Sequence, residues 1–100
     1  MKTGQIRHMV IFCLAYAKDS AEVEEFLKAG KEILCSIPTV QDFEVLKQIS
    51  NKNDYDYGFS MVFENQTDYD TYNNHPKHVS FVKERWMKEV TRFLEIDFTN

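Results

Sequence analysis

The chain has 100 residues, of which 43% are hydrophobic, and a formal net charge of -4 at pH 7. Its twelve Lys and Arg residues are scattered, which argues against a nucleic-acid-binding surface and against an anionic membrane as partner. No apolar run approaches the roughly 20 residues of a transmembrane helix, and the N-terminus lacks the pattern of a secretory signal. We therefore expect a single cytoplasmic domain over residues 1–100.

The supply of apolar side chains is large for a chain of this size. Eight Phe and five Tyr are more than a small monomer comfortably buries, so we expect a homodimer interface or a ligand cavity to use the surplus. Cys13 and Cys35 lack CxxC spacing and lie in apolar patterns, which indicates buried, reduced thiols.

The first half of the chain predicts a strand, a helix and a second strand. Residues 6–14 are apolar on both alternating faces, as expected of a strand covered on both sides. Asp19 and Ser20 offer N-cap chemistry for an amphipathic helix that ends at Pro38, with Gly30 on its apolar side for close packing. Residues 40–49 alternate as a strand with one wetter face.

The second half predicts a hairpin strand, two helical segments and a closing strand. Residues 55–63 place Tyr57, Phe59 and other large side chains on one face, and a four-residue turn before them indicates an antiparallel hairpin. Thr67 can cap a short helix that ends near Tyr72. A further helix follows from Pro76, with Val79, Val82, Trp86 and Val90 as its apolar stripe, and residues 91–99 alternate as the last strand.

This β-α-β-β-α-β order predicts a ferredoxin-like α+β fold, with one four-stranded antiparallel sheet and helices on one face. The second face of such a sheet is bare, and the aromatic side chains are the candidates to line it. Two copies that meet sheet to sheet would enclose a barrel-like cavity.

The most chemically suggestive stretch is Tyr72-Asn73-Asn74-His75-Pro76-Lys77-His78. Pro76 favours the first turn of a helix, which puts His75 at the helix start and His78 in the first turn. The helix dipole there favours a neutral imidazole, the form that a general base needs. A histidine that only caps the helix is the simpler alternative. A zinc site formed by His8, His75 and His78 is disfavoured because the proline makes their convergence hard to obtain.

In these residues the chain resembles the stress-responsive A/B barrel (Dabb) family of the dimeric α+β barrel superfamily. The matching features include residues 6–12, the Ile37-Pro38 helix end, residues 57–64, Tyr72 with residues 75–82, and Asp97-Phe98. The resemblance implies a ferredoxin-like protomer that dimerises through its sheet. Some members resemble polyketide cyclases, in which a tyrosine and a histidine of this motif act as an acid/base pair.

Carried over to this chain, the resemblance implies catalytic roles for Tyr72 and His78. We expect a pocket that binds a small apolar or aromatic molecule, without a cofactor or metal. Tyr57 stands at about the position where cyclase-like members place a further histidine. A non-catalytic, stress-associated binding protein and a cofactor-free monooxygenase are the alternatives. The expected ligand-binding residues are His8, His75, Tyr57, Phe59, Val10 and Phe12.

Overall fold

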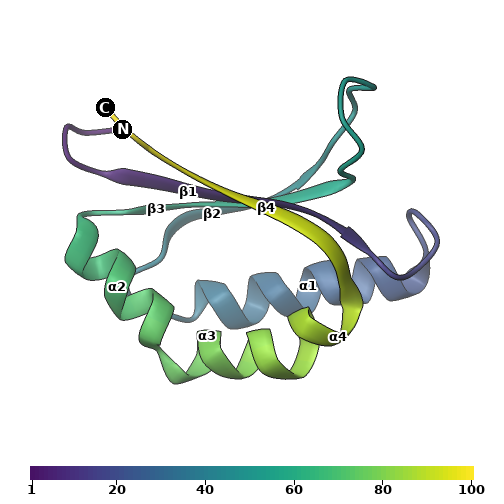
Figure 1. Ribbon diagram of the computed structural model, residues 1–100. Helices are drawn as coiled ribbons and strands as arrows, with labels where there is room; N and C mark the ends of the chain where they lie inside the picture. Colours follow the sequence, from purple (N-terminus) through teal and green to yellow (C-terminus); the bar gives the residue numbers. More distant parts are fainter.

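The computed structural model describes residues 1–100 and shows one antiparallel sheet with helices beneath it (Figure 1). The strand order is β2-β3-β1-β4, which is the expected ferredoxin-like arrangement. The elements in chain order are β1 (Ile6–Leu14), α1 (Ala21–Cys35), β2 (Gln41–Lys47), β3 (Tyr57–Phe63), α2 (Gln66–Asn74), α3 (Pro76–Phe81), the π-helix η1 (Val82–Trp86), α4 (Met87–Glu89) and β4 (Val90–Thr99).

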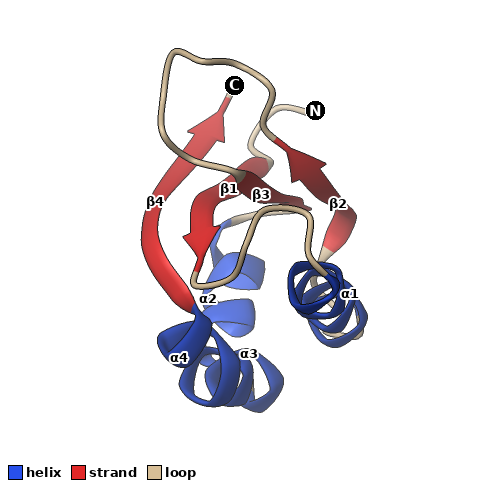
Figure 2. Cartoon of the chain, turned by 90° about the vertical axis from the view of Figure 1, so that its right-hand side faces the viewer, coloured by secondary structure: helices blue, strands red, loops and turns tan.

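All helices lie on the same side of the sheet, and the opposite side is open (Figure 2). The strand register decides which side chains face the helices. In β1 these include His8, Val10 and Phe12, which are buried, and their partners on β4 are Asp97, Glu95 and Phe93. The helix side of β4 is therefore partly polar, and its carboxylates lie next to the buried side chains of β1 in the same sheet.

The first helix forms for the reasons expected from its sequence. The Ser20 side chain accepts a hydrogen bond from the Val23 amide, and the helix ends at Cys35, shortly before Pro38. A Cβ atom on Gly30 would lie 2.7 Å from Cζ of Phe59, so only glycine lets α1 approach the sheet this closely. The expectation of close packing at this glycine is confirmed.

The start of α3 also agrees with the expectation. His75 is the N-cap, its side chain accepts a hydrogen bond from the Lys77 amide, and Pro76 opens the first turn. The preceding helix differs from the prediction because Asn65, not Thr67, caps it, and it continues to Asn74.

The apolar stripe predicted for the last helix is wrong in part. Val79 is 51% exposed, whereas Phe81 and Trp86 are buried. The reason is the π-helix at Val82–Trp86, in which hydrogen bonds span five residues. Residues five apart then share a face, so Phe81 and Trp86 both turn toward the sheet. Val90 already belongs to β4.

The aromatic face of β3 lies in the protomer core and not on the bare face of the sheet. Tyr57, Phe59 and Phe63 are each at most 2% exposed beneath the helices. The expectation that the aromatic side chains line the bare face is therefore wrong, because these side chains already pack inside one protomer. The bare face instead carries Met9, Ile11, Leu94, Ile96 and Phe98.

Two smaller expectations are also corrected. Ile49 lies outside β2 and is 98% exposed, so the second strand is shorter than predicted. Both cysteines are free thiols, but Cys35 is exposed and Cys13 only half-buried.

Candidate functional site

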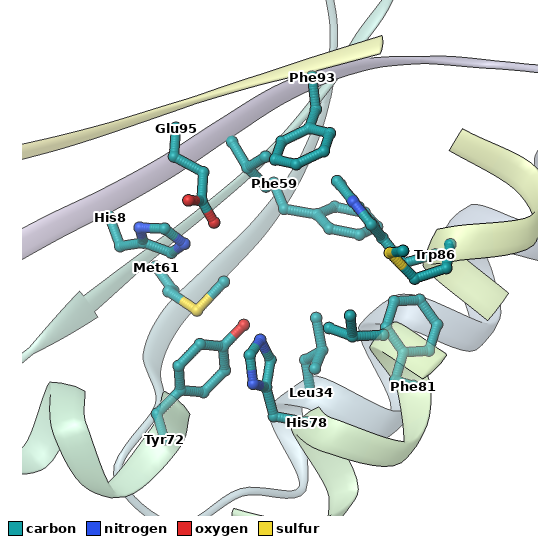
Figure 3. Close-up of a pocket in the computed structure, with 13 residues that line it drawn as sticks. His8, Leu34, Phe59, Met61, Tyr72, His78, Phe81, Trp86, Phe93 and Glu95 are labelled. Atoms are coloured by element: carbon teal, nitrogen blue, oxygen red, sulfur yellow. The ribbon is translucent and has the colours of Figure 1, made fainter. Parts of the chain in front are cut away.

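A cavity of about 230 Å³ lies between the sheet and the helices that cover it (Figure 3). One end is apolar, and Trp86 and Phe81 form it together with Leu34. The other end carries the polar groups of four side chains that come from β1, α2, α3 and β4. The cavity is lined by His8, Val10, Leu34, Phe59, Met61, Tyr72, His78, Phe81, Val82, Trp86, Met87, Phe93 and Glu95.

Tyr72 and His78 stand together on the helix wall of this cavity. Their ring centroids are 4.4 Å apart, and the Tyr72 hydroxyl and the His78 ring point into the cavity (Figure 3). The Nδ1 atom of His78 lies 3.0 Å from the Asn73 carbonyl oxygen. Because a carbonyl only accepts, Nδ1 carries the proton, and Nε2 of the neutral ring is left with a free lone pair.

Burial shifts both groups toward their neutral forms. Desolvation lowers the pKa of His78, although the hydrogen bond to Asn73 and the nearby Glu95 act in the opposite direction. Desolvation raises the pKa of Tyr72 well above the usual range of a phenol. At neutral pH the pair therefore offers one hydrogen-bond donor, Tyr72, beside one proton acceptor, His78.

His8 forms the opposite, sheet-side part of the polar end. Its Nδ1 atom is 2.6 Å from Oδ1 of Asp97 and 2.9 Å from the Tyr69 hydroxyl. The Tyr69 hydroxyl proton is directed to the carboxylate of Asp97, whose two oxygens lie 3.1 and 3.0 Å from the hydroxyl oxygen. His8 is only 4% exposed, so this Asp97–His8–Tyr69 cluster fixes a buried imidazole at the cavity wall.

Comparison with known proteins identifies the family. The family model of the stress responsive A/B barrel domain (Dabb) matches residues 6–100. This chain belongs to the stress-responsive A/B barrel family. A stress-response A/B barrel domain-containing protein of Arabidopsis thaliana is 31% identical in an alignment of 85 positions that covers 81% of this chain and 74% of the plant protein.

Solved structures agree with the fold. A Dabb family protein from Mesorhizobium loti is 51% identical, with a TM-score of 0.95 over 98% of each chain. A dimeric ferredoxin-like protein from Thermobifida fusca has a TM-score of 0.80 at 16% identity, covering 99% of this chain and 93% of its own. A hydroxynitrile lyase from Passiflora edulis has the same TM-score at 13% identity, covering 99% and 95%. The last two share the fold alone.

Most of the site residues expected for this A/B barrel chain lie in one place. His78, Tyr72, His8, Phe59 and Val10 line the cavity. Their chemical roles stay predictions.

Three of the expected ligand-binding residues lie outside the lining. His75 caps α3, and Phe12 packs in the core against Phe59 and Trp86. The Tyr57 hydroxyl accepts a hydrogen bond from the Asp19 amide, 3.1 Å away, and so holds the loop between β1 and α1. We therefore assign these three side chains to the fold and not to the cavity.

Sequence reasoning missed four side chains of the site region. The sequence pattern assigns Trp86 only to the apolar stripe of a helix, and it predicts no role for Glu95, Asp97 or Tyr69. The alternation of Phe93, Glu95 and Asp97 in the last strand is the one signal that was available, because it puts two carboxylates on one face. These two carboxylates come close to the histidines only because β4 pairs with β1.

No set of three or more His, Cys, Asp or Glu side chains in the chain has an arrangement suited to a metal ion. None of the helices has the length and apolarity required to cross a bilayer.

Proposed function

We propose that this A/B barrel protein binds a small apolar or aromatic carbonyl compound in the cavity and catalyses proton transfer at the carbon next to the carbonyl, as an aldol cyclisation requires. The observation that carries the proposal is the pairing of Tyr72 with His78, at 4.4 Å between ring centroids, at the polar end of an otherwise apolar cavity. A base and a hydrogen-bond donor beside an apolar space are the components needed for enolisation.

In this reaction the Tyr72 hydroxyl donates a hydrogen bond to the carbonyl oxygen. The raised pKa of Tyr72 keeps the phenol protonated at neutral pH, so the donor is available. Nε2 of His78 accepts the α proton, and the Asn73 carbonyl holds the other ring nitrogen in the required tautomer. The imidazolium that forms then returns its proton, so the enzyme ends the cycle unchanged.

The apolar end selects the ligand. Phe81, Trp86 and Leu34 surround the space farthest from the polar groups, where a ring would lose its contact with water. A volume of about 230 Å³ suits a molecule of one or two rings. We therefore propose flat aromatic ketones as the substrate class.

The test uses deuterium exchange into the α positions of 2-tetralone, a bicyclic aromatic ketone, in D2O, followed by ¹H NMR. We expect the wild-type protein to accelerate exchange over buffer, and His78→Ala to lose about 100-fold of the rate because it lacks the base. The exchange rate of Tyr72→Phe is expected to fall as well, since the ketone carbonyl loses its hydrogen-bond donor. Binding of the ketone is measured in parallel by line broadening.

His75→Ala is the matched control, because His75 belongs to the same motif but lies outside the cavity. It removes a helix cap and should lower the melting temperature while the exchange rate stays unchanged. If folded His78→Ala keeps both binding and exchange and only melts earlier, the histidine is structural and the protein is a non-catalytic binding protein. Oxygen uptake with quinols would instead indicate monooxygenase chemistry.

We further propose a homodimer that joins the bare faces of two sheets. That face carries Leu94 and Phe98, which are 46% and 50% exposed, together with Met9, Ile11 and Ile96. An apolar sheet face of this kind marks a protein interface more often than a free surface. The dimeric protein from Thermobifida fusca has the same fold, which supports this assembly. The free thiols of Cys13 and Cys35 support a reducing, cytoplasmic location.

A further inference from the structure

We propose that His8 is a second base of the cavity, and that Asp97 and Tyr69 position it for that role. This inference rests on the proposed function, because a second base acts on the same ligand as His78. It adds a catalytic residue on the sheet wall and two positioning residues that do not line the cavity.

The hydrogen bonds of His8 decide which ring nitrogen is basic. A carboxylate only accepts, so the 2.6 Å contact with Oδ1 of Asp97 requires the proton on Nδ1 of His8. The neutral ring then has its lone pair on Nε2, and Figure 3 shows the ring reaching into the cavity from β1. The lone pair of His8 is thus offered to a ligand from the sheet side, whereas that of His78 is offered from the helix side.

Tyr69 makes this arrangement rigid. Its hydroxyl donates to the carboxylate of Asp97, whose two oxygens lie 3.1 and 3.0 Å away, so the carboxylate cannot rotate freely. The Tyr69 ring stacks on Phe63, with a centroid distance of 4.9 Å and an interplanar angle of 10°. Asp97 is therefore anchored by its own strand, β4, and by the Tyr69 hydroxyl from α2. The fixed carboxylate in turn fixes the orientation of the His8 ring.

The surroundings of Asp97 explain how it can stabilise charge. Its side chain is 43% exposed, and a surface hollow whose lining includes Gln66, Tyr69 and Asp97 lies on the side away from the cavity. The exposed side of the Asp97 carboxylate therefore contacts water, while its hydrogen bond to Nδ1 of His8 lies on the buried side. The other polar groups that face His8 are Tyr72, whose ring centroid is 6.2 Å away, together with His78 and Glu95 at the cavity.

The proton balance is simple. Nε2 of His8 takes a proton from a carbon or hydroxyl of the ligand, the carboxylate of Asp97 stabilises the resulting imidazolium, and the same proton is returned in the reverse step. Asp97 remains a carboxylate throughout, and the Nδ1 proton stays between the two residues. Bases on opposite walls suit a flat ketone whose protons lie on both faces of the ring plane.

The test measures the tautomer of His8 and the rate of 2-tetralone exchange in the same variants. The chain has three histidines, so ¹⁵N NMR signals of imidazole-labelled protein are assigned by single substitutions. We expect His8 to carry its proton on Nδ1 in the wild type. In Asp97→Asn the amide NH2 can donate to Nδ1, so a tautomer with the proton on Nε2 should appear, and exchange of 2-tetralone should fall roughly tenfold or more in kcat with KM little changed.

Glu44→Gln is the matched control, since it removes one carboxylate from β2, the opposite edge strand. It should change neither the tautomer nor the rate, and Asp97→Glu should restore part of both. A wild-type His8 protonated on Nε2, or an Asp97→Asn variant with unchanged tautomer and kcat, would overturn the proposal. If the wild type does not exchange 2-tetralone, the proposed function and the base role fail together, while the tautomer still decides whether Asp97 positions His8.

Discussion

The protonation of His78 depends on the packing around its side chain. It stands in the first turn of α3 with one ring nitrogen bonded to the Asn73 carbonyl and the other facing an apolar cavity. Burial is the main cause that lowers its pKa, because the cavity solvates an imidazolium poorly. The neutral form required for proton transfer is thus favoured by the packing around it.

This shift has a consequence for stability. The unfolded chain binds a proton at His78 near its ordinary pKa of 6.5, whereas the folded protein binds it only at lower pH. As pH falls below that value, the unfolded state takes up more protons, so the free energy of unfolding decreases. We expect wild-type stability from urea titrations to decline between pH 7 and about pH 5 more steeply than that of His78→Asn.

The comparison between wild type and variant is the informative quantity, because the carboxylates titrate in both proteins. Parallel pH profiles for the two proteins would contradict the claim that His78 is buried in its neutral form. The sign also matters: a wild type that gains stability relative to the variant at low pH would mean that the site favours the imidazolium.

Among the elements, α1 depends on one residue for its distance from the sheet. Gly30 has Phe59 and Phe81 as its neighbours, and both aromatic rings also line the cavity. The closeness of helix and sheet thus sets the width of the space between them. A residue chosen for helix packing therefore influences the site.

We expect Gly30→Ala to destabilise the protein by about 1–3 kcal/mol, although alanine is the better helix former. The added Cβ would lie 2.7 Å from Cζ of Phe59, so that ring must move into the cavity. The melting temperature and the affinity for 2-tetralone should both fall. Lys31→Ala, on the exposed side of the same helix, is the control and should change neither. A Gly30→Ala protein as stable as the control would show that the Phe59 ring can move at no cost in stability, which contradicts this prediction.

The molecule as a whole has two sheet faces with different partners. One face is covered by its own helices, and the other is open (Figure 2). The helix side encloses the cavity, and the open side presents apolar side chains such as Leu94 and Phe98. Since the cavity lies wholly on the helix side, the proposed dimer and the proposed site use separate surfaces. Changes to one should leave the other largely intact.

We expect Leu94→Glu to weaken the dimer, because it would place two charges in an apolar interface. Native mass spectrometry and light scattering should show a shift from dimer to monomer. Val79→Glu puts the same charge on an exposed valine of α3, on the helix side, and should leave the dimer unchanged. A wild-type monomer, or a Leu94→Glu protein that dimerises as the wild type does, would contradict the sheet-to-sheet assembly.

The order of strands and helices follows from the sequence by itself, because the underlying signals are local. Ser20 and Pro76 act on the backbone within a turn of their own position, and the alternation of side chains along each strand indicates its two faces. The motif around Tyr72 and His78 was visible for the same reason, since both side chains come from neighbouring turns.

Tertiary structure decided which face of the sheet holds the aromatic side chains, the shift caused by the π-helix, and the partner of His8. Asp97 is 89 residues away along the chain, and it meets His8 only because β1 and β4 pair in one register. A slip of one residue would turn Asp97 to the other face, since strand side chains alternate. Such a pairing depends on the packing of the whole sheet and not on any local pattern.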